Sequence, residues 1–240
     1  LSSETYFVNN KDQYYQVTKN LNAGDTVVLE NGIWNDFEIL FEGQGTENEP
    51  IQLKAQTNGQ VFISGKSNLK IAGNYLIVSG LIFKDGYTPT NSVIEFRKNK
   101  YELANNSRIT EIVIDNFNNP DRTQNDNWVT IYGKNNRFDH NHLSGKKNKG
   151  VTLVVKLNSV ESQNNKHLID HNYISNRQIL GSNGGETLRI GTSHYSLQNS
   201  DTSVINNYFD KCDGELEIIS NKSGNNKFIG NFFNESRGTL

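Results

Sequence analysis

Two short segments carry the residue types best able to do chemistry, and the first reads DGELEIISNK. It spans residues 213–222 and holds Glu215 and Glu217, followed by Lys222. Side chains alternate between the faces of a strand, so this spacing predicts both carboxylates on one face and Lys222 just past the strand. Like charges so placed repel unless a cation lies between them, and calcium binds carboxylate and amide oxygens. Taken alone, the pattern is also typical of a solvated outer face.

The second segment reads SNGGETLRIG, spans residues 182–191, and predicts a turn that runs into a strand. Asn183 and Glu186 offer oxygen ligands, and Arg189 offers a guanidinium that can hold a sugar carboxylate through two N–H groups. A glycine-rich turn with a surface salt bridge is the alternative. The segment precedes the first by about one coil and a loop in a solenoid, and that spacing predicts that the two lie side by side.

A repeated motif indicates the scaffold that would position these segments. Two apolar residues, a variable residue, Asn or Gly, and two more apolar residues recur at irregular intervals. The motif is centred on Gly80, Asn116, Asn141, Asn172, Asn207 and Asn231. A fixed motif with variable spacing predicts a solenoid whose coils share strands and differ in their loops, with the asparagines stacked from coil to coil. We therefore predict an all-β fold, a single-stranded right-handed parallel β-helix, over a β-sandwich or propeller.

The two ends of the chain differ. Residues 10–21 have apolar residues at helical spacing, which predicts a short helix that caps the open end of the strands. No break in composition divides the chain, so residues 1–240 are expected to form one domain. A solenoid needs a cap at each end, and none is visible before Leu240. We therefore expect the N-terminal part of a longer protein.

Composition excludes some classes of function. The net charge is -2, from 24 Lys+Arg and 26 Asp+Glu, which lacks the basic excess that nucleic-acid binding usually needs. No segment is long and apolar enough to suggest a membrane partner. The chain has neither a starting Met nor a signal peptide, so we expect a secreted or periplasmic protein whose signal has been removed. The oligomeric state is not predicted.

Taken together, the two segments resemble polysaccharide lyase family 6, which includes chondroitinase B and the β-helical alginate lyases. The resemblance covers nearly the whole chain and is carried by residues 22–89, by NGGETLRIG at 183–191 and by GELEIISNKSGNN at 214–226. It implies a right-handed parallel β-helix and a calcium-assisted β-elimination on a 4-linked uronate polymer.

The resemblance also implies roles, position by position. It implies calcium ligands at Asn183, Glu215 and Glu217, a further ligand or close neighbour at Glu186, a Brønsted base at Lys222 and a substrate-holding arginine at Arg189. The family's acid arginine follows the SRGTL sequence, so its equivalent is expected beyond Leu240, and Arg237 is not that residue.

Alginate is the substrate that the resemblance favours. The segment KDGYTP at 84–89 is similar to the alginate branch of the family. A dermatan sulfate lyase on the same scaffold is one alternative, although sulfate recognition favours more basic residues than this chain has. A β-helix that binds an acidic glycan without cutting it is the other.

Two further groups of residues have open interpretations. His140 and His171 fall at equivalent places in the repeat, which predicts a stacked exterior pair or a wall of a sugar subsite. Lys146, Lys147 and Lys149 form a basic run that is typical of a solvated turn or of a glycan contact.

Overall fold

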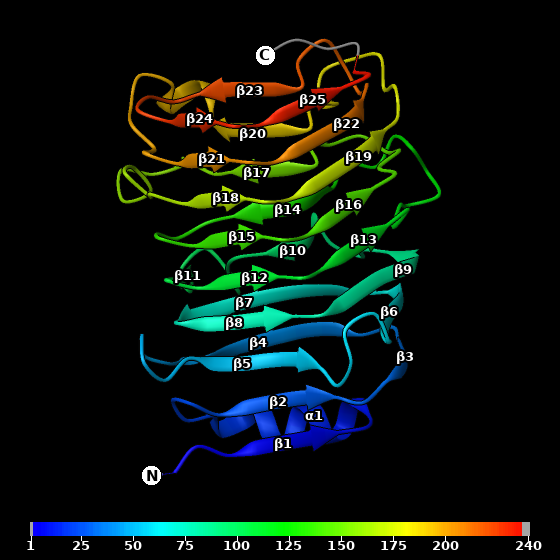
Figure 1. Cartoon of the computed structure of the whole chain (residues 1–240), viewed down its shortest axis with the longest axis vertical. Coiled ribbons are helices and arrows are strands. Elements are labelled where there is room, and N and C mark those ends of the chain that lie inside the picture. The colour runs from blue at the N-terminus through cyan, green and yellow to red at the C-terminus, as the bar shows by residue number, and fades with distance from the viewer. Residues whose placement is uncertain (1, 237–240) are drawn as a thin grey trace.

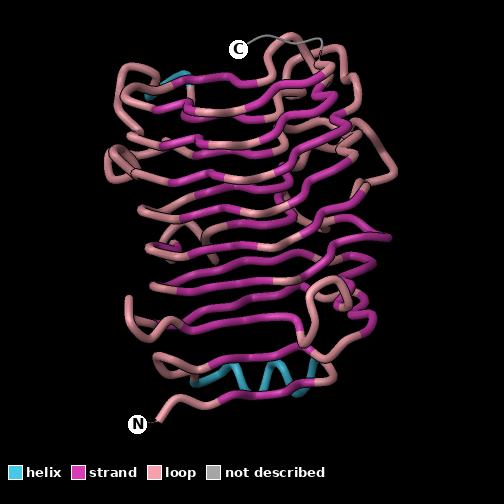
Figure 2. Tube along the Cα trace, in the orientation of Figure 1, coloured by secondary structure: helices cyan, strands magenta, loops and turns pink. Residues whose placement is uncertain are grey.

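The computed structural model describes residues 2–236, and almost all of its regular structure is parallel β-strand. The chain winds into flattened coils stacked along one axis, with the N-terminus at one end of the stack and the described C-terminal residues at the other (Figures 1 and 2). Three parallel sheets run the length of the stack. The predicted parallel β-helix with a short N-terminal helix is confirmed.

Each sheet takes about one strand from each coil. The first sheet contains β1 (Thr5–Val8), β2 (Thr26–Leu29), β5 (Ile51–Ala55), β8 (Leu76–Ser79), β12 (Arg108–Thr110), β15 (Arg137–Asp139), β18 (Leu168–Asp170), β21 (Ser203–Ile205) and β24 (Lys227–Ile229). The second contains β3 (Gly32–Asn35), β6 (Val61–Lys66), β9 (Leu81–Tyr87), β13 (Val113–Asp115), β16 (His142–Ser144), β19 (Tyr173–Arg177), β22 (Tyr208–Cys212) and β25 (Phe232–Asn234). The third contains β4 (Glu38–Gln44), β7 (Asn68–Asn74), β11 (Ala104–Asn105), β10 (Ser92–Glu95), β14 (Asn127–Ile131), β17 (Leu153–Val155), β20 (Leu188–Gly191) and β23 (Ile219–Lys222).

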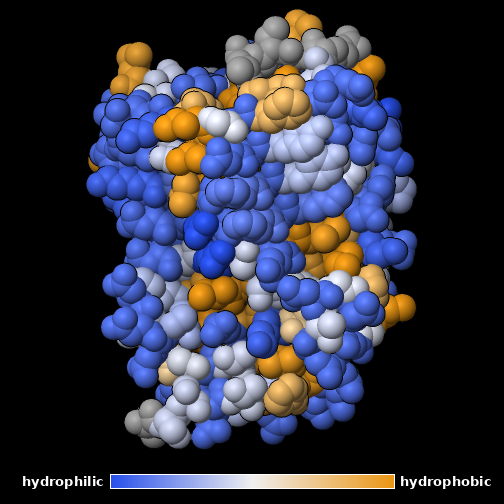
Figure 3. All heavy atoms as spheres, in the orientation of Figure 1, coloured by the Kyte–Doolittle hydropathy of each residue, from blue (hydrophilic) through white to orange (hydrophobic). Residues whose placement is uncertain are grey.

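The core is a narrow column of stacked apolar side chains. Ile109, Phe138, Ile169 and Val204 occupy one register position on successive coils, and all four are fully buried. Each coil contributes few inward side chains, so a chain with 34% hydrophobic residues can still fill this core. One face of the exterior is mostly hydrophilic with separate apolar patches (Figure 3).

The predicted helical segment forms α1 (Lys11–Val17) and the 3₁₀ turn η1 (Thr18–Asn20) beside the first coils (Figure 1). The Asn10 side chain caps α1 by accepting a hydrogen bond from the Gln13 backbone N–H at 2.8 Å. Tyr14 is fully buried and its hydroxyl donates to the Leu40 carbonyl at 2.6 Å, which ties the helix to the solenoid. A second 3₁₀ turn, η2, spans Ser193–Tyr195. No helix in residues 2–236 is long and apolar enough to cross a membrane.

Four of the predicted asparagines form a ladder along the bend between the first and second sheets. The Asn141 and Asn172 backbone N–H groups donate to the next side chain in the ladder, Asn172 Oδ1 and Asn207 Oδ1, at 3.1 and 3.0 Å. Asn207 donates in the same way to Asn231. The side-chain amides also donate to main-chain carbonyls, as Asn172 does to Phe138 at 2.9 Å. This ladder confirms the stacking predicted from the motif.

The predicted register was wrong at Gly80 and Asn116. Gly80 lies beside Glu111, whose carbonyl accepts its N–H, and Asn116 lies one position beyond β13, level with Gly145 beyond β16. Asn116 has φ 48°, so it serves as a left-handed turn residue rather than as a ladder residue. The same residue type fills both roles, so the motif alone could not separate them.

Replacing Asn172 by alanine is expected to lower the free energy of unfolding by about 2–4 kcal/mol, because it leaves buried backbone groups without partners. The Asn172 side chain is 2% exposed. Denaturant unfolding measures the effect, with Asn91→Ala as the exposed control, which should change stability little. Equal stability of the two variants would contradict a structural role for the ladder.

Candidate functional site

The two chemical segments lie next to each other in the third sheet. Strands β20 and β23 pair in parallel, with Leu188 beside Ile219 and Gly191 beside Lys222. Their predicted proximity is confirmed. A pocket of about 570 Å³ opens between the turn that precedes β20 and the segment that precedes β23. Its lining includes every predicted site residue: Asn183, Glu186, Arg189, Glu215, Glu217 and Lys222.

The Glu215–Glu217 segment is not the regular strand that the sequence predicted. Strand β23 begins only at Ile219, and Leu216 is 72% exposed rather than turned inward beside Ile218. Only glycine fits at position 214 in this segment, because a Cβ there would lie 2.0 Å from the Gly185 carbonyl oxygen. Lys222 is the last residue of β23 rather than a residue beyond it.

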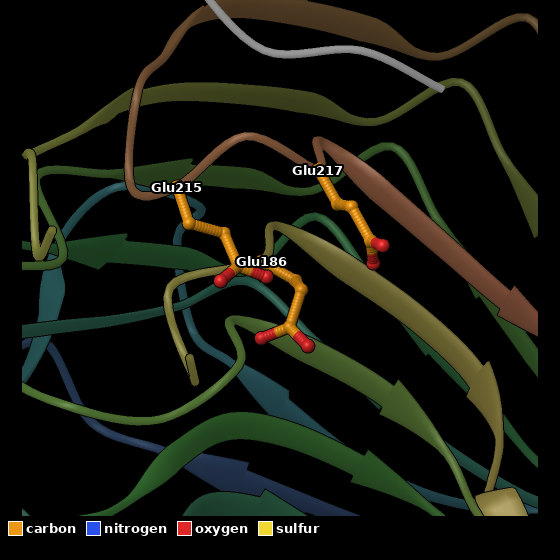
Figure 4. Close-up of side chains that lie close together, drawn as sticks. All are labelled: Glu186, Glu215 and Glu217. Atoms are coloured by element: carbon orange, nitrogen blue, oxygen red, sulfur yellow. The ribbon is translucent and has the colours of Figure 1, made fainter. Parts of the chain in front are cut away.

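Three carboxylates meet in the pocket. Glu186, Glu215 and Glu217 each offer one oxygen, and these atoms all lie within 4.8 Å of one another (Figure 4). Glu186 comes from the turn before β20, and the other two come from the segment before β23. Glu186 is only 6% exposed, and its Oε2 has no hydrogen-bond partner among residues 2–236. A buried, unpaired carboxylate oxygen is costly unless a cation or proton compensates it.

The pKa of Glu215 reflects its burial and the repulsion among the three carboxylates of this cluster. Its burial, followed by the charges of Glu186 and Glu217, raises the pKa to about 7. The positive charge of Lys222 acts in the opposite direction. The cluster therefore suits a hard divalent cation such as calcium, which takes carboxylate oxygens together with amide oxygens. Asn183 lines the same pocket and can supply an amide oxygen.

Cationic side chains lie beside the carboxylates on the outer face of the third sheet. Arg189 is half-buried on β20, and its Nε has no hydrogen-bond partner in the described part of the chain. Burial lowers the pKa of Lys156, and the nearby charges of Arg189 and Arg97 lower it further. These positive charges beside a cation site suit a ligand that carries carboxylates.

The first residue of the basic run at 146–149 is buried rather than part of a solvated turn. Lys146 is 1% exposed, and its Nζ lies 3.3 Å from Asp126 Oδ1 and 3.0 Å from the Asn148 carbonyl. Burial lowers the pKa of Lys146 to about 7. The prediction of a solvated turn was therefore wrong for this residue, because Asp126 and carbonyls of its own loop surround its ammonium group.

A buried arginine that the sequence interpretation missed lies beside Lys146. Arg177 ends β19, and its guanidinium donates to carbonyls of residues 146 and 148. No sequence signal marks Arg177, since arginine at the end of a strand is usually exposed.

The two predicted stacking histidines lie away from the pocket. His140 and His171 stack with ring centroids 5.0 Å apart and planes 2° apart, which confirms the stacked exterior pair. Their Nδ1 atoms lie 2.7 and 2.8 Å from Asp139 and Asp170. Neither histidine lines the pocket. Arg237 lies outside the described residues.

Comparison with known proteins places the chain in a family. The family model described as Chondroitinase B matches residues 8–240. The chain belongs to the chondroitinase B family. Solved structures that resemble it are described as members of polysaccharide lyase family 6, so the family resemblance seen in the sequence is confirmed. No curated protein matches the chain.

Three related solved structures are similar to this chondroitinase B family chain over nearly its whole length. The PL6 family alginate lyase AlyGC is 60% identical with a TM-score of 0.97, and the match covers 98% of this chain and 32% of AlyGC. A mannuronic acid specific family 6 lyase from human gut microbiota is 39% identical with a TM-score of 0.93, covering 99% of this chain and 55% of that one. A PL6 family polysaccharide lyase from Pseudopedobacter saltans is 30% identical with a TM-score of 0.88, covering 97% and 53%. The chain thus spans about a third to a half of these relatives.

Proposed function

We propose that this protein is a calcium-dependent polysaccharide lyase that cleaves alginate by β-elimination. The observation that carries the proposal is the convergence of three carboxylates, Lys222 and Arg189 on one pocket. The similarity to AlyGC, described as an alginate lyase, and to a mannuronic acid specific lyase supports the choice of polymer. Because the chain spans only part of these relatives, the proposal concerns the activity of the whole protein.

The carboxylate cluster has a defined part in this reaction. We propose that Glu186, Glu215, Glu217 and Asn183 hold calcium at the pocket. When bound, calcium would neutralise the carboxylate of the uronate, which otherwise makes the adjacent C5 proton hard to remove. A near-neutral protein can bind a polyanion in this way because the required positive charge is local.

Arg189 and Lys222 act on the substrate itself. Arg189 holds the sugar carboxylate through its guanidinium and so orients C5. Lys222 accepts the C5 proton on its Nζ as a general base. The electron pair of the C5–H bond forms a C4–C5 double bond as the C4–O4 bond breaks. The leaving O4 takes a proton from an acid that we place beyond Leu240.

Calcium affinity is expected to be about tenfold weaker at about pH 6 than at about pH 8, because Glu215 must lose its proton to bind the ion. Its raised pKa of about 7 means that the proton is held below pH 7 and released above it. Isothermal titration calorimetry at both pH values measures the change, and Glu215→Gln should flatten it. Equal affinity at both pH values in the unaltered protein would contradict the assignment of Glu215 as a ligand.

We also propose that the protein acts outside the cytoplasm, in the periplasm or after secretion. A long alginate chain is too large and too charged to cross a membrane unaided. Fractionation of cells that express the natural gene, followed by detection of the protein in each fraction, tests this proposal.

The substrate is tested by incubating the protein separately with alginate and with dermatan sulfate. β-Elimination creates an unsaturated uronate, so a rise in ultraviolet absorbance reports each cut. We expect a rise with alginate. A rise with dermatan sulfate alone would redirect the proposal to that polymer. Retention of alginate without any rise, in a form that extends beyond Leu240, would identify a binding protein instead.

A further inference from the structure

A buried cation lies beneath the pocket and contacts both segments that build it. Arg177 is 1% exposed, and its guanidinium donates only to main-chain carbonyls among residues 2–236. The acceptors, at 3.1–3.4 Å, belong to Lys146, Asn148, Gly150, Gln178 and Gly184.

The contact with Gly184 reaches the turn that supplies ligands to the pocket. Gly184 lies between Asn183 and Glu186 in the sequence, and its carbonyl accepts from Arg177 Nη2 at 3.3 Å. The same carbonyl accepts from the Gly150 backbone N–H at 2.9 Å. These two hydrogen bonds hold the carbonyl toward the interior and so fix the orientation of the turn. That orientation sets the backbone positions from which the Asn183 and Glu186 side chains extend.

The stem of Arg177 reaches the other ligand-bearing segment. A Cβ built on Gly214 would lie 3.0 Å from Arg177 Cγ, so the two residues are in close contact. Gly214 directly precedes Glu215. One buried side chain therefore touches both the turn before β20 and the segment before β23.

The charge of Arg177 also matters for the cluster. No carboxylate in the described chain forms an ion pair with Arg177 within 4.0 Å. The carboxylates of Glu186 and Asp126 nevertheless favour its charged form. Burial lowers the pKa of Arg177 to about 10, so the guanidinium remains positive at neutral pH. Of these two carboxylates, Asp126 also lies 3.3 Å from the ammonium of Lys146.

We propose that Arg177 is a positioning residue for the cation site, holding the Asn183–Glu186 turn and the Gly214–Glu217 segment at the separation that a divalent cation needs. The inference rests on the proposed calcium site and concerns how this chain builds it. Buried arginines suit this role because five fixed N–H donors can bind several carbonyls at once.

The test compares Arg177→Met, which keeps a stem of similar length, with Arg177→Lys, which keeps the charge but not the fork. We expect Arg177→Met to raise the calcium Kd by about 10- to 100-fold, the usual range for residues that orient metal ligands. Arg177→Lys should recover part of that loss. Isothermal titration calorimetry measures Kd, and thermal unfolding in chelator measures the stability of the calcium-free protein. Arg137→Met, which removes an ion pair with Asp170 on the first sheet, is the control, and its Kd should be unchanged.

A separate readout distinguishes positioning from general support of the fold. Activity measured against calcium concentration should show a higher half-saturating concentration in Arg177→Met, with the rate at saturating calcium largely retained. A folded Arg177→Met variant with the original Kd would overturn the inference. If Arg177→Met does not fold, an unchanged Kd in Arg177→Lys overturns the role of the guanidinium fork. An unaltered protein that binds no calcium would instead refute the proposed function, before any variant is compared.

Discussion

Replacing Lys222 by alanine is expected to reduce kcat on alginate by about 10²–10⁴-fold, the usual contribution of a general base. Lys222 ends β23 and lines the same pocket as the carboxylate cluster, in which we propose that the uronate binds. The substitution removes the proposed proton acceptor but none of the proposed calcium ligands. The ultraviolet absorbance of the unsaturated product measures the loss.

Two comparisons make the Lys222 result specific. Lys222→Ala should bind calcium at least as tightly as the unaltered protein does, because removing a positive charge near three carboxylates cannot repel a cation. Lys227→Ala changes an exposed lysine on β24, the next strand in the sequence, which lies in the first sheet, and should leave kcat unchanged. A Lys222→Ala variant with full activity would exclude Lys222 as the base.

Replacing Glu217 by glutamine is expected to raise the calcium Kd by at least about tenfold and to raise the half-saturating calcium concentration for activity in parallel. The amide keeps the size of the side chain but removes one of three charges that lie within 4.8 Å of one another. The same change relieves repulsion among the carboxylates, so the calcium-free variant should be no less stable than the unaltered protein. Calorimetry and thermal unfolding in chelator measure the two effects.

The matched control for Glu217 is Glu235→Gln, which alters an exposed carboxylate 3.7 Å from Lys211. Its calcium Kd should equal that of the unaltered protein. If Glu217→Gln bound calcium as tightly as the control, the cluster would not be the calcium site. Opposite effects on affinity and on calcium-free stability are characteristic of a ligand and are not expected from a residue that only supports the fold.

The fold could be predicted because its repeating physical unit is visible in the sequence. Asparagine at Asn141, Asn172, Asn207 and Asn231 satisfies main-chain groups at the same bend in successive coils, and apolar residues flank each one. The convergence of the site followed from the same repeat, because segments one coil apart must pair. Residues 183–191 and 214–222 therefore lie together in the third sheet.

The remaining details depended on tertiary contacts that no local pattern records. Gly80 and Asn116 fit the motif but serve left-handed turns. Gly214 approaches Gly185 on the preceding coil too closely for any side chain to fit. Lys146 and Arg177 are buried only because neighbouring loops fold over them and supply carbonyl acceptors. A sequence shows that such residues are charged, but not that their charge is enclosed.

The most direct measurement follows ultraviolet absorbance as alginate is mixed with chelator-treated protein, first without and then with added calcium. The protein should be a form that extends beyond Leu240, so that the proposed acid is present. We expect no rise before calcium is added and a steady rise afterwards. A rate in chelator equal to the rate in calcium would contradict the central claim that this pocket uses calcium to cleave alginate.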